Sequence, residues 1–164
     1  DSFVEWIYFI NTSLMNKFAD LSNKVREEAQ ANFEKTIVRN KMLFASLNDN
    51  EILDPRLIME NLNMDSYLGI PLMIIGNKSD SIASLNPQAF SAVQYSLRNL
   101  ALKYGASLTF TSAKQSATLR NLYRYLAYIV YQNEHTKLEP DLKPEKFFVP
   151  MGFDNQEDLD KEFA

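Results

Sequence analysis

The chain has 164 residues, of which 46% are hydrophobic and 23% are charged, and its formal net charge of −4 goes with a pI of about 5.1. This composition is typical of a soluble globular domain that is large enough to bury a core. The acidic balance and the lack of a basic cluster argue against a nucleic-acid surface, and the absence of cysteine excludes disulfides and thiolate metal sites.

Features of a metalloenzyme, a triad hydrolase or a membrane protein are missing from the sequence. The single histidine, His135, lies in a polar stretch after a predicted helix and is expected to be solvated. No run is long and apolar enough for a membrane helix, and none resembles a signal peptide. We therefore expect a cytoplasmic protein with no metal, no nucleic-acid partner and no direct membrane insertion. Because the chain opens with Asp1 and not Met, we expect a fragment of a longer protein.

Apolar residues at helical spacing predict two helices in the first third of the chain. The first covers residues 1–21, with Ser2 as a cap and Trp6 as an anchor in the core. The second covers residues 23–47, carries more charge and is expected to be more exposed. Its thin apolar stripe consists of Val25, Ala29, Phe33, Ile37 and Phe44. Residues 48–68 are rich in Asn and Asp and are expected to form an inserted loop.

A short apolar run from Leu72 to Ile75 is bounded by Gly69-Ile70-Pro71 before it and by Gly76 after it. Such a run predicts a strand inside a parallel sheet whose two faces are both covered by helices. Because side chains alternate along a strand, Ile74 and Ile75 are expected to be buried on opposite faces.

Asn77-Lys78-Ser79-Asp80 follows this strand directly, at the edge where open α/β sheets hold ligands. It matches the guanine-recognition motif of Ras-like GTPases. The carboxylate of Asp80 can accept hydrogen bonds from two adjacent donors of guanine. Asn77 can bond the base edge, and the stem of Lys78 can lie across the base. A polar strand-to-helix turn, with Asn and Asp as turn formers, would explain the same residues.

A second helix–strand unit follows this motif. Asn86 and Pro87 are the expected cap and first residue of a helix that ends at Gly105. A strand then leads into Ser112-Ala113-Lys114, as in Ras-like folds, where the Ala backbone N–H meets the guanine carbonyl. The expected buried stripe of the helix is Phe90, Val93, Leu97, Leu100 and Tyr104.

A third helix is predicted after Lys114, with an apolar stripe on the sheet and tyrosines at the rim of the core. The stripe consists of Leu119, Leu122, Leu126, Ile129 and Val130, and the tyrosines are Tyr123, Tyr125, Tyr128 and Tyr131. The middle of the chain thus alternates helix–strand–helix–strand–helix. This predicts an α/β fold of the P-loop NTPase/Ras-like class, a doubly wound and mostly parallel sheet with extra helices and an extended C-terminal tail.

The tail is expected to contain a linker at 138–144, a short strand stopped by Pro150, a turn after Gly152 and a helix at 156–163. Its apolar side chains have two interpretations. They extend the domain core, or part of the cluster stays exposed and binds a partner. The partner-binding candidates are Phe147, Phe148, Val149 and Phe153. Alternation predicts that one of the first two faces the core and that the other is exposed.

The phosphate loop of a working GTPase, Gly-x-x-x-x-Gly-Lys-Ser/Thr, cannot be formed by the four glycines at 69, 76, 105 and 152. The chain therefore corresponds to the second half of a Ras-like domain at 1–137, with an insertion at about 22–67 and a tail at 138–164. No catalytic residue can be assigned. The candidate guanine site, which is vestigial if the phosphate loop is lost, consists of Asn77, Lys78, Asp80, Ser112, Ala113 and Lys114.

Several motifs of the chain resemble the dynein light intermediate chain family. The most specific is Phe148-Val149-Pro150-x-Gly152-Phe153-Asp154-Asn155, which is similar to the family's FVPAGWDN with Met and Phe where Ala and Trp are common. The others are Asp1-Ser2-Phe3-x-x-Trp6, Leu68-Gly69-Ile70-Pro71, Asp80-Ser81-Ile82, Tyr104-Gly105-Ala106-Ser107-Leu108 and Thr111-Ser112.

The resemblance implies a non-catalytic, GTPase-like subunit of the cytoplasmic dynein motor, associated with microtubules. It implies docking on the tail of the dynein heavy chain and contact with cargo adaptors through a C-terminal region outside this chain. No cofactor is certain, and GDP or GTP is a ligand to be tested in the full-length protein. The alternative is an active small GTPase whose phosphate loop lies upstream. A light intermediate chain of ciliary dynein fits the tail motif less well.

Overall fold

The structure is a computed structural model and describes residues 2–19, 23–48, 70–131 and 139–164. The expected loop at 48–68 falls almost entirely outside these residues, as do His135 and the first residue of the linker. In chain order the elements are α1 (Ser2–Ala19), α2 (Asn23–Asn48), β1 (Leu72–Gly76), the 3-10 helix η2 (Ser79–Ser84), α4 (Pro87–Lys103), β2 (Ala106–Phe110), α5 (Ser116–Tyr131), the 3-10 helix η3 (Pro144–Lys146), β3 (Phe148–Val149) and α6 (Gln156–Glu162).

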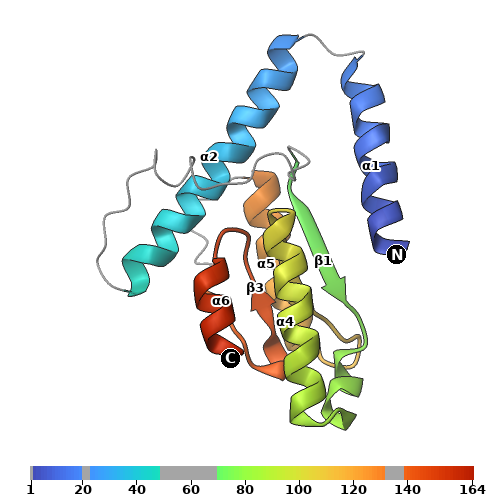
Figure 1. Ribbon diagram of the computed structural model, residues 1–164, viewed down its shortest axis with the longest axis vertical. Helices are drawn as coiled ribbons and strands as arrows, with labels where there is room; N and C mark the ends of the chain where they lie inside the picture. Colours follow the sequence, from blue (N-terminus) through green and yellow to red (C-terminus); the bar gives the residue numbers. More distant parts are fainter. Residues whose placement is uncertain (1, 20–22, 49–69, 132–138) are drawn as a thin grey trace.

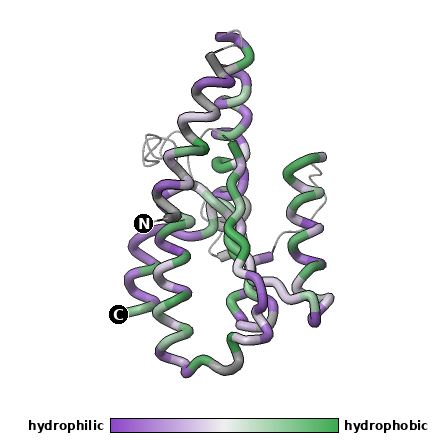
Figure 2. The backbone as a smooth tube through the Cα atoms, turned by 90° about the vertical axis from the view of Figure 1, so that its right-hand side faces the viewer, coloured by the Kyte–Doolittle hydropathy of each residue, from purple (hydrophilic) through white to green (hydrophobic). Residues whose placement is uncertain are grey.

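A three-stranded mixed sheet forms the centre of the described fold, in the order β1-β2-β3. β1 and β2 are parallel, with Leu72 opposite Ala106 and Gly76 opposite Phe110. β3 pairs with β2 in the antiparallel sense, with Leu108 opposite Val149. Figure 2 shows three layers, with α4 and α6 on one side of the sheet and α5 on the other. The predicted α/β alternation is therefore confirmed, as a small mixed sheet.

The core on the α4 side is built from alternate residues of the strands. β2 is buried along its whole length, since it lies between two strands and two helical layers. The buried members of this cluster are Ala101, Ala106, Leu108, Phe110, Phe147 and Val149. Phe110 stacks on Phe147 with ring centroids 4.6 Å apart, which ties β2 to the tail.

The core on the α5 side is built from tyrosines, and the predicted orientation of this helix is wrong. Tyr125 and Tyr128 are buried against Phe148, whereas Leu126 is 44% exposed and Val130 is 68% exposed. Both sides of this helix are apolar, so periodicity identifies the helix without saying which side faces the sheet. The aromatic rings supply the larger contact area, and they occupy the inward positions.

The expected burial of both isoleucines of β1 is also wrong. Ile74 packs against the α4-side core, but Ile75 on the opposite face is 47% exposed. β1 lies at the edge of the sheet, and α5 covers only part of this face within the described residues. The two-sided burial typical of an inner parallel strand is therefore not reached at Ile75.

The first helix forms as predicted, but Trp6 does not anchor it in a core. Trp6 is 63% exposed and makes an edge contact with Phe9, which is itself 64% exposed. Figure 1 shows α1 outside the layers formed by α4, α6, the sheet and α5. Trp6 and Phe9 therefore lie on an exposed part of α1 and not in a core.

The second helix contributes more to the core than its charge predicts. Phe33 and Ile37 are buried with Met151 of the tail, whereas Val25 near the start of the helix is 44% exposed. Asn40, also buried, donates to the Met151 carbonyl at 2.9 Å and accepts from the Tyr128 hydroxyl at 2.6 Å. One polar side chain thus joins α2 to the tail and to α5.

The tail folds back on the domain, as the first of the two interpretations predicts. Phe147 and Phe148 are 0% and 2% exposed, so the expectation that one of them is exposed is wrong. They point to opposite sides of the sheet, but both sides are covered, by α4 and by α5. Val149 is buried and Phe153 is half-buried. These four side chains therefore act as core, and this conformation does not offer them as an exposed anchor.

Polar side chains determine where α4 and α6 begin and which side of α4 is buried. Asn86 caps α4 by accepting from the Ala89 N–H, and Asn155 caps α6 by accepting from the Asp158 N–H. Along α4, however, Val93 is 41% exposed and the buried positions are Gln94, Arg98 and Ala101. The tail covers the polar side of α4, so the predicted buried stripe of this helix is only partly right.

Candidate functional site

The two polar motifs predicted to bind guanine lie side by side at the carboxyl ends of β1 and β2. The Thr111 N–H donates to the Gly76 carbonyl at 2.8 Å, and the Ser79 N–H donates to the Thr111 carbonyl at 2.9 Å. These bonds continue the pairing of the parallel strands beyond their last residues. They hold the loop after β1 against the loop after β2, as the sequence predicts.

Asp80 is the centre of this site. Its Oδ1 accepts from the Ser112 hydroxyl at 2.6 Å, and its Oδ2 accepts from the Lys114 ammonium at 2.8 Å. The hydrogen bond from Lys114 and that from Ser112 lower the pKa of Asp80 below its usual range, and the same contact raises the pKa of Lys114. Asp80 is thus a fixed carboxylate, and each of its oxygens already has a donor.

Asn77 and Lys78 shape the turn that places this carboxylate. Lys78 has a φ of 60° and lies in the left-handed region, and its N–H donates to Asn77 Oδ1 at 2.7 Å. The Asn77 side chain thus supports the backbone of the turn, and asparagine is one of the residues favoured in turns. Asn77, Lys78, Ala113 and Lys114 are all exposed, so the upper surface of the site is open.

A base edge that donates two adjacent hydrogen bonds to Asp80 competes with Lys114 and Ser112 for its two oxygens. Each carboxylate oxygen accepts more than one hydrogen bond, so both partners can remain. Lys114 is the easier of the two to displace, because its side chain is 81% exposed. The residues of the predicted guanine site are therefore assembled, and guanine binding itself stays a prediction.

An apolar groove of about 310 Å³ adjoins Asp80 on the side of α4. Ile82, Leu85 and Phe90 line it, and Ser79 lies in its wall. The Ser79 hydroxyl is buried and has no hydrogen-bond partner among the described residues. This groove was not predicted from the sequence, where its signal is the apolar pair after the motif, Ile82 and Leu85.

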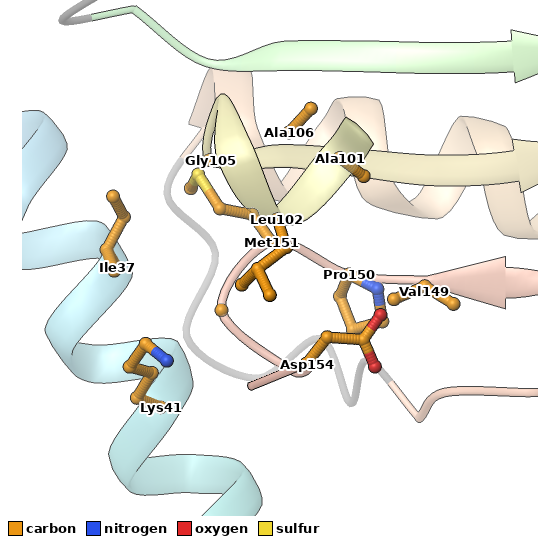
Figure 3. A pocket seen from close by; sticks show the side chains of 11 residues that line it. Ile37, Lys41, Ala101, Leu102, Gly105, Ala106, Val149, Pro150, Met151 and Asp154 are labelled. Atoms are coloured by element: carbon orange, nitrogen blue, oxygen red, sulfur yellow. The ribbon is translucent and has the colours of Figure 1, made fainter. Parts of the chain in front are cut away.

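A second hollow, of about 20 Å³, lies where α2 meets the tail. Figure 3 shows Ile37 and Lys41 on α2, with Met151 and Asp154 across from them on the tail. A space of this size holds about one water molecule. Burial lowers the pKa of Lys41, and the charge of Asp154 opposes that shift. The hollow is therefore a packing seam between two elements and is too small for a ligand.

Neither a metal nor a membrane is indicated by the part of the chain that the structure describes. Within residues 2–19, 23–48, 70–131 and 139–164, no group of three or more His, Asp or Glu side chains is placed to hold a metal ion. None of the helices in those ranges is long and apolar enough to span a bilayer.

Comparison with known proteins gives one consistent family. The sequence model described as "Dynein light intermediate chain (DLIC)" matches residues 10–161. Cytoplasmic dynein 1 light intermediate chain 1 of Dictyostelium discoideum is 28% identical over 73% of this chain, and the human protein of that name is 28% identical over 56%. Cytoplasmic dynein 2 light intermediate chain 1 of Rattus norvegicus is 30% identical over 65%.

These similarities cover only part of the relatives. The chain spans 24%, 19% and 27% of the three proteins, so it corresponds to about a quarter of their length or less. The crystal structure of the dynein light intermediate chain's conserved domain is 22% identical, covers 58% of this chain and 34% of that chain, and has a TM-score of 0.48. The identities do not separate the dynein 1 group from the dynein 2 group.

Proposed function

This chain belongs to the dynein light intermediate chain family, and we propose that it is part of a non-catalytic light intermediate chain subunit of the cytoplasmic dynein motor complex. In this role the domain docks on the tail of the heavy chain. A C-terminal region of the same protein, outside this chain, links the motor to cargo adaptors for transport along microtubules. The protein is then cytoplasmic and associated with the cytoskeleton.

The observation that carries this proposal is the match of the family model to residues 10–161, nearly the whole chain. The non-catalytic role is inferred from membership of this family. It is supported by Asp80, since the ion pair with Lys114 and the hydrogen bond from Ser112 occupy both of its oxygens. A scaffold needs a rigid fold and a partner surface, and neither requires a reacting group.

The test is whether the full-length protein is a stoichiometric component of dynein. We expect the tagged protein, expressed in its own cells, to elute with the dynein heavy chain in size-exclusion chromatography. The Asp80→Asn variant is the matched control, since a purely structural subunit does not need the nucleotide site. Elution of the wild-type protein as a free monomer, without any heavy chain, would contradict the proposal.

The assembled motif residues favour one second candidate, a guanine-nucleotide-binding protein that is an active small GTPase with its phosphate loop upstream. The hydrogen bond from the Ser112 hydroxyl to Asp80 supports this candidate, because it fixes the carboxylate that the motif predicts to accept from the base. The full-length protein distinguishes the two candidates. A GTPase hydrolyses GTP in a single-turnover assay and loses this activity in Asp80→Asn, whereas a structural subunit shows no hydrolysis above the rate without protein.

A further inference from the structure

The apolar groove that adjoins Asp80 has the size and the lining of a small-molecule site. Its apolar lining consists of Ile82 in η2, Leu85, Pro87 and Phe90 at the entry into α4, and Pro144 in η3. We call this hollow the Asp80 groove. Its volume of about 310 Å³ lies at the lower end of the range for such sites and suits a ligand of two fused rings. Leu85 is 44% exposed, so the groove is open to a ligand from solvent.

Three polar residues, Ser79, Asp80 and Gln115, complete the lining of the Asp80 groove. The buried hydroxyl of Ser79 finds no hydrogen-bond partner in the described ranges, and such a group is one that a water or a ligand commonly completes. The side chain of Asp80 is 22% exposed, and the hydrogen bonds from Lys114 and Ser112 hold its pKa below the usual range. An apolar groove with a few polar groups and a carboxylate of shifted pKa is typical of a ligand site.

The charges around the Asp80 groove favour a neutral ligand. Asp80 is the only ionisable side chain among the described residues that line it. Lys114 already pairs with this carboxylate at 2.8 Å, and the exposed Lys143 directly precedes Pro144. A cationic ligand would meet these two ammonium groups, and an anionic ligand would meet the carboxylate of Asp80. A neutral group that donates hydrogen bonds can use the lone pairs that Ser112 and Lys114 leave on the two oxygens.

We propose that the Asp80 groove binds a neutral bicyclic amino-heterocycle, whose two adjacent N–H groups donate to Asp80 and whose apolar ring lies against Leu85 and Phe90. The polar edge of this ligand is the donor pair that the motif is predicted to accept from guanine. Its body, however, enters the apolar groove and makes no use of a phosphate-binding loop. The inference goes beyond the proposed function, because a ligand site in the groove does not depend on association with dynein.

The experiment uses the full-length protein and 2-aminoquinazolin-4-one as the probe. This neutral molecule carries two adjacent N–H donors on one ring and an apolar benzo ring at the other end. Saturation-transfer NMR detects its binding and shows which of its protons contact the protein. We expect the benzo protons to receive the strongest saturation and the dissociation constant to be on the order of 1 mM or tighter. 4-Aminoquinazoline, which has the same two rings without the adjacent donor pair, should bind at least roughly tenfold more weakly.

Substitutions test the two ends of the site. Asp80→Asn should weaken binding of the probe at least roughly tenfold, because the amide nitrogen is a donor and cannot accept from the N–H pair. Leu85→Asp should weaken it by about tenfold, since a carboxylate then faces the apolar ring, and the milder Leu85→Ala should weaken it by about threefold. Val93→Asp is the matched control, because Val93 is 41% exposed on α4 and does not line the groove. We expect no effect of this change on the probe.

Several outcomes would overturn the inference. They are absence of saturation transfer from the wild-type protein, equal binding of 4-aminoquinazoline, and equal affinity of the Leu85→Asp and Val93→Asp variants for the probe. GDP gives a further comparison, since the body of guanine is expected over Lys78 and not in the groove. An equal loss of GDP and probe binding in Leu85→Asp would place the probe at the predicted base position and also contradict the inference. Elution of the protein without the heavy chain would contradict only the proposed function.

Discussion

The guanidinium of Arg98 on α4 donates two hydrogen bonds to the carboxylate of Asp154 in the tail, at 2.9 Å from Nε to Oδ2 and 2.7 Å from Nη2 to Oδ1. Both side chains are buried, at 3% and 8% exposure. A third contact, from Arg98 Nη1 to Glu162 at 2.8 Å, involves the end of α6. One arginine thus connects the helix over the sheet to two points of the C-terminal segment.

The first prediction concerns this pair. Asp154→Ala should lower the free energy of unfolding by about 3–5 kcal/mol, because removal of one partner leaves a buried charge without its bidentate acceptor. The remaining contact with Glu162 reduces the loss toward the lower end. Urea unfolding of the two proteins measures the difference. The double variant Arg98→Met/Asp154→Leu should be less destabilised than Asp154→Ala, and equal or greater destabilisation would show that the apolar pair does not fit this site.

The second prediction concerns Gly76 at the end of β1. A Cβ atom at this position would lie 2.5 Å from Cδ1 of Phe110, closer than real contacts allow. The ring cannot move away easily, because it is stacked on Phe147 and meets the edge of Phe90. Gly76→Ala should therefore cost about 1–3 kcal/mol, the usual range for an overfilled core.

The matched control for Gly76→Ala is a second change that removes the obstacle. In the background of Phe110→Leu, the additional step Gly76→Ala should cost clearly less than it does alone, since the clash is with the ring. Thermal or urea unfolding of the four proteins gives the coupling energy of the pair. Additive effects would mean that the cost of the new methyl group comes from elsewhere in the strand.

Local patterns and chain order predicted a large part of this fold. The alternation of helices and strands, the cap at Asn86, and the meeting of Asp80 with Ser112 all follow from short segments and from the geometry of parallel strands. These features depend on residues close in sequence, or on the rule that parallel strands end at one edge. The family motif in the tail was also visible, because it is short and specific.

What sequence reasoning missed depends on contacts between distant segments. Arg98 looks like a solvated helix residue until Asp154, 56 positions later, folds over it. The rotation of α5 could not be read from a helix with two apolar sides, so Tyr125 and Leu126 were assigned to the wrong positions. The apolar run around Ile75 is typical of a central strand, but β1 is an edge strand of the described sheet.

The third prediction concerns the buried hydroxyl of Tyr125. Burial raises the pKa of Tyr125 to about 12, although Ser107 and the Met151 backbone oppose the shift. Its hydroxyl forms no hydrogen bond of ordinary geometry with the described residues. In the unfolded chain this group ionises near 10, whereas in the folded protein it stays protonated to about 12. Its contribution to stability is thus fully present below pH 10 and is lost as the pH rises to about 12.

Comparison with Tyr125→Phe isolates this contribution, because the other tyrosines are the same in both proteins. Near pH 7 the variant should be close to neutral or slightly more stable, since it removes a buried polar group without a normal hydrogen bond. Between pH 10 and 12 the stability of the wild-type protein should fall relative to the variant, by about 2–3 kcal/mol at most. Parallel curves over this pH interval would show that Tyr125 ionises normally in the folded state.

The last prediction concerns the guanine site. This chain should bind GDP no more tightly than micromolar, because the phosphate loop that would hold the charged end of the nucleotide is absent from the sequence. The base alone has to compete with Lys114 for Asp80 and to order itself on an open surface. In titration calorimetry, Lys114→Ala should therefore bind GDP at least as well as the wild-type chain, since Asp80 Oδ2 is then free for the base.

Asp80→Asn should abolish the remaining binding, whereas the exposed-residue control Lys78→Arg, which keeps the charge and a long stem, should change it little. A submicromolar dissociation constant that Asp80→Asn removes would show that these loops make a complete nucleotide site without a phosphate loop, and the interpretation of the motif as a vestige would then be wrong.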